Sequence, residues 1–194
     1  MEKFKPKESL KTERLVLLKR EHEHDEEMFR AIEESREFIR EYLFWVDGQK
    51  SLDDVVKATD MFAKSWEDDN EWAYNIYTLT DHRLIGSIGI HNIHFQNQSA
   101  ELGYWLRKSD IGRGYMTEAV EVVEKEIFEQ GMHRLTIRCD ANNKNSANVA
   151  LRAGFTLESV AKDAVYHYTG LHDLETYVKF SPYPIVGFEN GKLS

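Results

Sequence analysis

The sequence has one cysteine, three prolines and no long apolar run. The single cysteine, Cys139, excludes an internal disulfide, so the reducing cytoplasm is the expected compartment. A membrane-spanning helix needs about 20 consecutive apolar residues, and no stretch of the sequence approaches that length. The N-terminal residues, MEKFKPK, are polar and basic and lack the apolar core of a signal peptide. We therefore expect no membrane partner.

Basic residues are also in the minority, with 25 lysines and arginines against 34 aspartates and glutamates. The formal net charge of −9 argues against a nucleic-acid partner, because such a partner requires a basic face. An acidic surface attracts a cationic amine, although solubility alone accounts for the same charge.

The apolar content is sufficient for a core, since 41% of the 194 residues are hydrophobic. Pro182 and Pro184 interrupt regular structure near the end of the chain. We expect a single domain over residues 1–181, followed by a C-terminal tail at 182–194.

Helical and alternating apolar patterns predict an α+β fold. A capping box at Ser51–Asp54 marks the start of the most regular amphipathic helix. Residues 1–13 are expected to form a loose arm. The expected strands are 14–18, 72–79, 84–90, 100–106, 135–139, 155–168 and 174–180, with 100–106 and 135–139 parallel. The expected helices are two stretches within 25–43, then 52–68, a long helix that ends at Gly131, and 146–153.

A Gly-x-Gly turn, Gly112-Arg113-Gly114, lies between the strand at 100–106 and the long helix. Glycine permits backbone angles that a β-carbon forbids, and the first N–H groups of a helix have no intrahelical partner. This arrangement binds phosphate, with Arg113 adding charge. As a bare pattern it is more often only a turn, and it lacks both the third Rossmann glycine, at Thr117, and a P-loop lysine.

Two sequence blocks resemble the GCN5-related N-acetyltransferases (GNAT). The first joins Glu101–Leu106 to Ile111–Ala119, and the second runs from Cys139 to Ala150 and continues through Gly154–Glu158. Within that family, the chain is most similar to the branch that acetylates ribosomal-protein N-termini. The resemblance covers residues 14–180 and departs at Ser109, where the wider family often has Gln or Arg.

The resemblance implies a mixed, mostly antiparallel central sheet of six to seven strands flanked by helices. A splayed parallel strand pair within that sheet would hold acetyl-CoA as cosubstrate. The residues implied for the cofactor are backbone groups of Trp105, Leu106 and Arg107 for the pantetheine arm; amides of Gly112, Arg113, Gly114, Tyr115 and Met116, with the Thr117 hydroxyl, for the pyrophosphate; and Asn143, Ser146 and Asn148 on the far side.

Acetyl transfer to an amine requires a proton acceptor for the amine and benefits from a proton donor to the departing thiolate. By the resemblance, Ser146 matches the serine proposed as general acid, and a helix N-cap is the alternative interpretation. Glu101 is our candidate base, acting directly or through water, with a structural ion pair as its alternative. Asp163 and the pair His172-Asp173 are further candidates, and a relay of waters would need no single base.

The other reactive residues favour structural roles. His91 and His94 form an H-x-x-H pattern, but strand spacing places them on opposite faces of a sheet, so we expect no metal site. Cys139 alternates with Leu135 and Ile137 and is expected to be buried as a small apolar residue.

These observations predict an acetyl-CoA-dependent N-acetyltransferase that works by direct transfer in a ternary complex. The favoured acceptor is a protein N-terminal amine, and a small amine or polyamine is the alternative. A non-catalytic acyl-CoA-binding sensor is the hypothesis from another class. In this family Tyr42, Phe44 and Trp45 would lie near the acceptor entrance, and an aromatic core patch is the equal alternative. Both a monomer and a homodimer remain compatible with the sequence.

Overall fold

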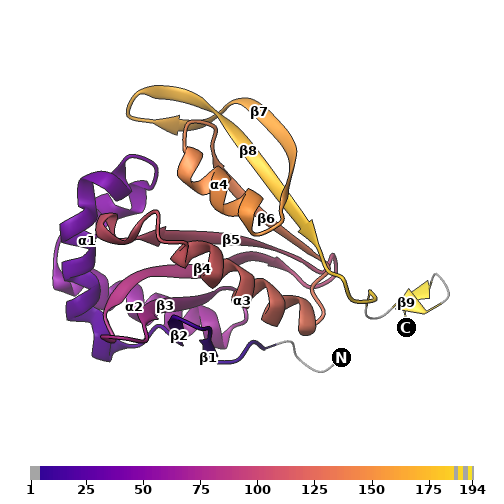
Figure 1. The fold of residues 1–194 in the computed structure, drawn as a ribbon, viewed down its shortest axis with the longest axis horizontal. Coiled ribbons are helices and arrows are strands. Elements are labelled where there is room, and N and C mark those ends of the chain that lie inside the picture. Colours follow the sequence, from indigo (N-terminus) through magenta and orange to yellow (C-terminus); the bar gives the residue numbers. More distant parts are fainter. Residues whose placement is uncertain (1–4, 186–187, 190–191, 194) are drawn as a thin grey trace.

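A computed structural model describes residues 5–185, 188–189 and 192–193. Its centre is an eight-stranded sheet in the order β1-β2-β3-β4-β5-β6-β8-β7 (Figure 1). All neighbouring strands in this sheet are antiparallel except β5 and β6. The strands are β1 Ser9–Lys11, β2 Leu15–Lys19, β3 Trp72–Thr78, β4 Leu84–His94, β5 Ser99–Leu106, β6 Arg134–Asp140, β7 Thr156–His167 and β8 Gly170–Phe180.

Among the described residues, four α-helices and three 3₁₀ turns complete the fold. The α-helices are α1 Asp25–Arg40, α2 Leu52–Glu67, α3 Tyr115–Glu129 and α4 Lys144–Arg152; the 3₁₀ turns are η1 His22–His24, η2 Phe44–Gly48 and η3 Lys108–Asp110. In the tail, β9 (Phe188–Glu189) pairs with β10 (Lys192–Leu193) in a separate two-stranded ladder. Within the described part of the chain, no helix is long and apolar enough to cross a membrane.

The predicted fold class is confirmed, and the sheet has one strand more than the seven expected. The additional strand is β1, which lies in the segment predicted to be a loose arm and pairs Ser9 with Leu18 of β2. The two helical stretches predicted within 25–43 are one continuous helix, α1, which ends at Arg40. The predicted capping box is confirmed, because the Ser51 side chain accepts from Asp54 N and the Asp54 side chain accepts from Ser51 N.

Helices cover both faces of the sheet, and β3 is therefore buried along its whole length. Apolar residues of α3, among them Val120, Val123 and Ile127, pack with Leu102 of β5 in the larger core cluster. On the other face, α1 and α2 enclose a smaller cluster. Burial of these side chains contributes about 25 cal/mol per Å² of apolar surface, which makes the two clusters the main source of stability.

The strands β5 and β6 separate after a short paired segment. Their parallel register covers Ser99↔Arg134, Ala100↔Leu135 and Glu101↔Thr136, and the described strands pair no further. Figure 1 shows the two strands close together at one end and apart at the other. The predicted splayed pair is confirmed, and its open end faces the start of α3.

Candidate active site

A cavity of about 400 Å³ opens where β5 and β6 separate. It extends from the turn before α3, along both strands and the start of α4, to the end of α1 and to β7. Ten of the twelve residues expected to contact the cofactor line it: Trp105, Leu106, Gly112, Gly114, Tyr115, Met116, Thr117, Asn143, Ser146 and Asn148. The two sequence blocks therefore meet in one space.

The Gly-x-Gly turn has the backbone geometry that only glycine adopts easily. Gly112 and Gly114 have φ values of 75° and 79°, in the left-handed region. Gly114 is the N-cap residue of α3. No side chain at this N-cap hydrogen-bonds to the first N–H groups of the helix. An anion at this position is stabilised by unpaired N–H groups and by the helix dipole.

Arg14, which the sequence analysis missed, supports this turn from the position just before β2. Its Nη1 donates to the Arg113 carbonyl at 2.9 Å, and its Nε donates to Glu118 at 2.6 Å. The guanidinium also lies 4.8 Å from the centre of the Tyr115 ring. These contacts join residues about one hundred positions apart, so local sequence gives no signal for them.

A buried ion pair anchors the segment before the turn. Asp110 of η3 is fully buried and accepts two hydrogen bonds from Arg83, at 2.8 and 2.6 Å. Burial alone would raise the pKa of Asp110, but the hydrogen bonds from Arg83 and Ser109 outweigh it and lower that pKa. Ser109 Oγ donates to Asp110 at 2.9 Å, so this departure from the family pattern takes part in anchoring the segment.

Two predicted cofactor residues lie outside the cavity. Arg107 N donates to the Ile85 carbonyl at 2.7 Å, and the Arg107 guanidinium binds Glu34 at 2.6 Å. Its N–H is therefore already occupied, and the pairing of the Arg107 backbone with the pantetheine arm stays a prediction. Arg113 is exposed and contributes its carbonyl to Arg14.

Ser146 lies in the first turn of α4 and faces the cavity. The N-cap of α4 is Asn143, whose Oδ1 accepts from Ser146 N at 3.1 Å, so the N-cap interpretation of Ser146 is wrong. Ser146 Oγ lies 3.1 Å from the Tyr104 hydroxyl. Burial raises the pKa of Tyr104, so this phenol stays protonated and is able to donate to Ser146. Cys139 is buried as expected, and burial raises the pKa of its thiol to about 11.

Glu101 is enclosed by hydrogen-bond donors. Its carboxylate accepts from Arg138 at 2.9 Å and from Asn92 at 3.1 Å, and His91 lies 3.4 Å away. Burial alone would raise the pKa of Glu101, but hydrogen bonds from His91, Arg138 and Asn92 outweigh it and lower that pKa to about 2. A carboxylate held in this way is a weak proton acceptor at neutral pH, which favours the ion-pair alternative.

The Glu101 ion pair predicts a stability effect that depends on pH. Because its folded pKa lies below the ordinary value of 4.5, ionised Glu101 stabilises the fold above about pH 4.5, and this contribution is lost as pH falls toward 2. The difference corresponds to roughly 3 kcal/mol. We expect Glu101→Gln to lower the free energy of urea unfolding at pH 7, with a gap to wild type that narrows at pH 3.

Glu158→Gln is the matched control for that measurement, because Glu158 pairs with Arg134 at the surface. Exposed pairs contribute about 0–1 kcal/mol, so this variant should differ little from wild type at either pH. An equal loss in the two variants would contradict the assignment of Glu101 as a stabilising ion pair.

Aromatic side chains of the predicted acceptor entrance line the other end of the cavity or flank it. Tyr42 lines it, and its hydroxyl donates to the Asn142 carbonyl at 3.3 Å. Trp45 lies 5.9 Å from Trp105, ring centre to ring centre, and is 41% exposed. Because Trp45 belongs to η2 and Trp105 to β5, the entrance forms only when the helical segment docks on the sheet.

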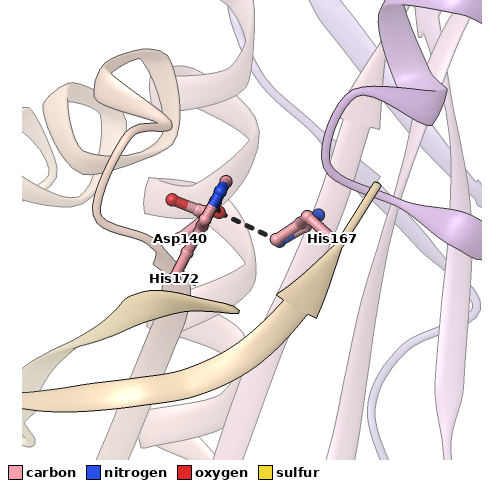
Figure 2. Close-up of side chains that lie close together, drawn as sticks. All are labelled: Asp140, His167 and His172. Atoms are coloured by element: carbon pink, nitrogen blue, oxygen red, sulfur yellow. Dashed lines mark hydrogen bonds and ion pairs between the residues drawn. The ribbon is translucent and has the colours of Figure 1, made fainter. Parts of the chain in front are cut away.

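A cluster of Asp140, His167 and His172 lies beside this entrance (Figure 2). The sequence analysis named His172 as a candidate base but missed Asp140 and His167. Asp140 Oδ2 is 3.0 Å from His167 Nε2 and 2.5 Å from His172 Nδ1. One oxygen thus lies close to both imidazoles: it accepts a hydrogen bond from His172, and His167 lies at ion-pair distance from it. The sequence analysis considered His91 and His94 as a metal pair. In the structure His91 contacts Glu101, and His94 pairs with Ser99 of β5.

The class of protein follows from these features and from the family comparison. Residues 14–156 match the acetyltransferase (GNAT) domain, and the chain belongs to this family. The family resemblance is thus confirmed: the protein is an N-acetyltransferase with acetyl-CoA as cosubstrate.

Two relatives within the acetyltransferases share sequence with most of this chain. The chain is 27% identical over 157 residues to the ribosomal-protein-serine acetyltransferase of Escherichia coli (strain K12), covering 80% of this chain and 87% of that protein. It is 32% identical over 135 residues to the probable N-acetyltransferase YjcK of Bacillus subtilis (strain 168), covering 68% and 75%.

Two solved structures share the fold. The ribosomal L7/L12 α-N-protein acetyltransferase RimL in complex with coenzyme A superposes with a TM-score of 0.85 at 23% identity, over 89% of this chain and 98% of that one. The microcin C7 self-immunity acetyltransferase MccE in complex with acetyl-CoA and AMP gives a TM-score of 0.82 at 25% identity, over 87% and 93%.

Proposed function

We propose that this enzyme acetylates the N-terminal amine of a protein, by direct transfer from acetyl-CoA in a ternary complex. The observation that carries the proposal is the single cavity that joins the glycine turn at the start of α3, the open strand pair and the aromatic entrance. The proposed cofactor and acceptor regions adjoin in this one space, so the amine can reach the thioester directly and no covalent acetyl-enzyme is required. Two relatives with ribosomal-protein acetyltransferase names or titles support the choice of acceptor.

In this proposal the cofactor lies along the residues that line the cavity. The amides at Gly112, Gly114 and the start of α3 bind the pyrophosphate. The edge of β5 that faces β6 has no strand partner beyond Glu101 among the described residues, which leaves backbone groups near Trp105 for the pantetheine arm. Asn143 and Asn148 contact the arm from the opposite side.

The amine attacks the thioester carbonyl, the C–S bond breaks, and Ser146 supplies a proton to the thiolate, with Tyr104 donating to Ser146 in turn. Ser146 lies in the cavity between the glycine turn and the acceptor entrance, as this role requires.

The proposal also includes a single domain over residues 1–181, a cytoplasmic location and the absence of a nucleic-acid or membrane partner. Both a monomer and a homodimer are compatible with it.

A matched pair of peptides tests the acceptor. Each carries one amine: the first has a free N-terminal serine and no lysine, and the second has a blocked N-terminus and one lysine. We expect thiol release from acetyl-CoA to be at least about tenfold faster with the first, because the free α-amine is the proposed nucleophile. Faster release with the lysine peptide would contradict the proposal.

Small amines and polyamines form the other arm of this experiment, because the MccE structure of similar fold is a complex with acetyl-CoA and a small molecule, AMP. Turnover with a polyamine but with neither peptide would replace the protein acceptor by a small amine. Acetyl-CoA binding without turnover on any acceptor would indicate a sensor.

A further inference from the structure

Transfer to an amine, as proposed above, needs a proton acceptor on the acceptor side of the cavity. An amine is largely protonated at neutral pH and becomes a nucleophile only after it loses a proton. Glu101 is already bound by Arg138 and Asn92 and does not line the cavity. The inference below rests on the proposed function and supplies this missing group.

His167 has the geometry of a base. It is the last residue of β7, is 4% exposed, and lines the same cavity as Ser146. Its Nε2 lies 3.0 Å from Asp140 Oδ2, and a carboxylate only accepts, so Nε2 carries the ring proton. The lone pair is therefore on Nδ1, which is buried and has no hydrogen-bond partner among the described residues. Nδ1 points away from Asp140 (Figure 2).

Asp140 is fixed from two further directions. Its Oδ2 also accepts from His172 Nδ1, and its Oδ1 accepts from Asn142 N at 2.7 Å. The His172 ring is held in turn by the Thr169 hydroxyl, which donates to Nε2 at 2.8 Å. The carboxylate thus fixes both the orientation and the tautomer of His167, and it stabilises the imidazolium that forms when His167 takes up a proton.

The ring of His167 lies between the aromatic side chains of the acceptor entrance and Asp140 at the end of β6. Phe44 and Tyr42 pack on it, with ring centres 4.9 and 6.1 Å away. Asp140 is the last residue of β6, one of the two separating strands. An amine that enters past Tyr42 therefore meets His167 before it reaches the carbonyl between β5 and β6.

We infer that His167 is the catalytic base, with Asp140 as the residue that positions it and His172 as the residue that positions Asp140. The ammonium gives one proton to Nδ1, from which it passes to water. The neutral nitrogen forms the C–N bond as the C–S bond breaks, and Ser146 gives its proton to the departing thiolate. The second proton of the nitrogen passes through His167 to water, and a proton from water restores Ser146 by way of Tyr104. Overall, one acetyl group is transferred and one proton is released.

His167→Gln tests the base, because the glutamine amide still donates to Asp140 but accepts no proton. We expect kcat to fall about 100-fold at pH 7 with the KM for acetyl-CoA unchanged. The matched control is His22→Gln, at a histidine that also binds an aspartate, Asp25, at 2.8 Å but lies outside the cavity. Equal turnover of His167→Gln and the control would overturn the inference.

The pH profile separates a base from a structural residue. The titratable groups that face His167 are Asp140, His172 and Tyr42. Turnover of His167→Gln should rise about tenfold per pH unit below the pKa of the amine, because only amine deprotonated in water reacts. Wild-type turnover should instead rise less steeply with pH, because the site itself takes up the proton of the bound amine. Profiles of the same shape in both proteins would contradict the inference.

Two measurements keep the test independent of the acceptor. Nitrogen-15 NMR of the imidazoles at pH 8 should show His167 with a protonated Nε2 and a bare Nδ1, and a protonated Nδ1 would overturn the inference even if no amine were turned over. EDTA should leave wild-type turnover unchanged, whereas a loss restored by Zn²⁺ would assign the cluster to a metal. Failure of every amine acceptor in the presence of the predicted tautomer would count against the proposed function alone.

Discussion

Replacing Gly114 by glutamate is expected to abolish acetyl-CoA binding. The glycine has a φ of 79° and starts α3, so a side chain here lies at the end of the helix where the pyrophosphate is proposed to bind. The new carboxylate repels the phosphates and competes with them for the free N–H groups. We expect the Kd, measured by calorimetry, to rise at least about 100-fold, which corresponds to about 2.7 kcal/mol.

Gly170→Glu is the matched control for this experiment. Gly170 also has a positive φ, 121°, and has open space around it, but it lies at the turn between β7 and β8, outside the cavity. Both variants carry the same charge and a left-handed backbone that costs about 1–2 kcal/mol for a non-glycine residue. Loss of binding in both would indicate general unfolding, and retained binding in Gly114→Glu would refute the placement of the phosphates.

The phosphate end of the cavity could be predicted because its signals are local. Gly112 and Gly114 are adjacent to a periodic helix, and the backbone rules that apply to them need no tertiary information. The capping box at Ser51–Asp54 is confirmed for the same reason. The splay between β5 and β6 came from the family resemblance, since no spacing rule predicts where two parallel strands cease to pair.

The features that the sequence did not predict depend on contacts between distant elements. β1 has no apolar run of its own and becomes a strand because β2 offers it an edge. Asp140 and His167 approach each other only when β8 is inserted between β6 and β7. The predicted strands 155–168 and 174–180 also put the turn between them too far along the chain. In the structure β7 ends at His167 and β8 begins at Gly170, so His172 lies in β8 opposite Val165.

The start of α4 shows how neighbouring candidates compete. Residues 142–146 offer three asparagines and one serine, all of which are suitable N-caps. β6 ends at Asp140, whose carbonyl accepts from Asn143 N at 2.8 Å, and this turn makes Asn143 the cap. Ser146 is thereby released from capping, and its hydroxyl is left beside Tyr104 in the cavity.

Because Ser146 has no capping role, Ser146→Ala should affect catalysis far more than stability. Loss of the proton donor leaves the thiolate to depart unprotonated, and we expect kcat for the fastest amine to fall about 100-fold with the Kd for acetyl-CoA within about twofold of wild type.

Tyr104→Phe, which removes the hydroxyl 3.1 Å from Ser146 Oγ, should lower kcat less than Ser146→Ala does. The double variant should be no slower than Ser146→Ala alone, because the phenol acts through the serine. Ser159→Ala, on the exposed β7, is the control for loss of a hydroxyl. Unchanged turnover in Ser146→Ala would remove the serine as the acid, and additive losses in the double variant would show that Tyr104 donates to the thiolate by a separate route.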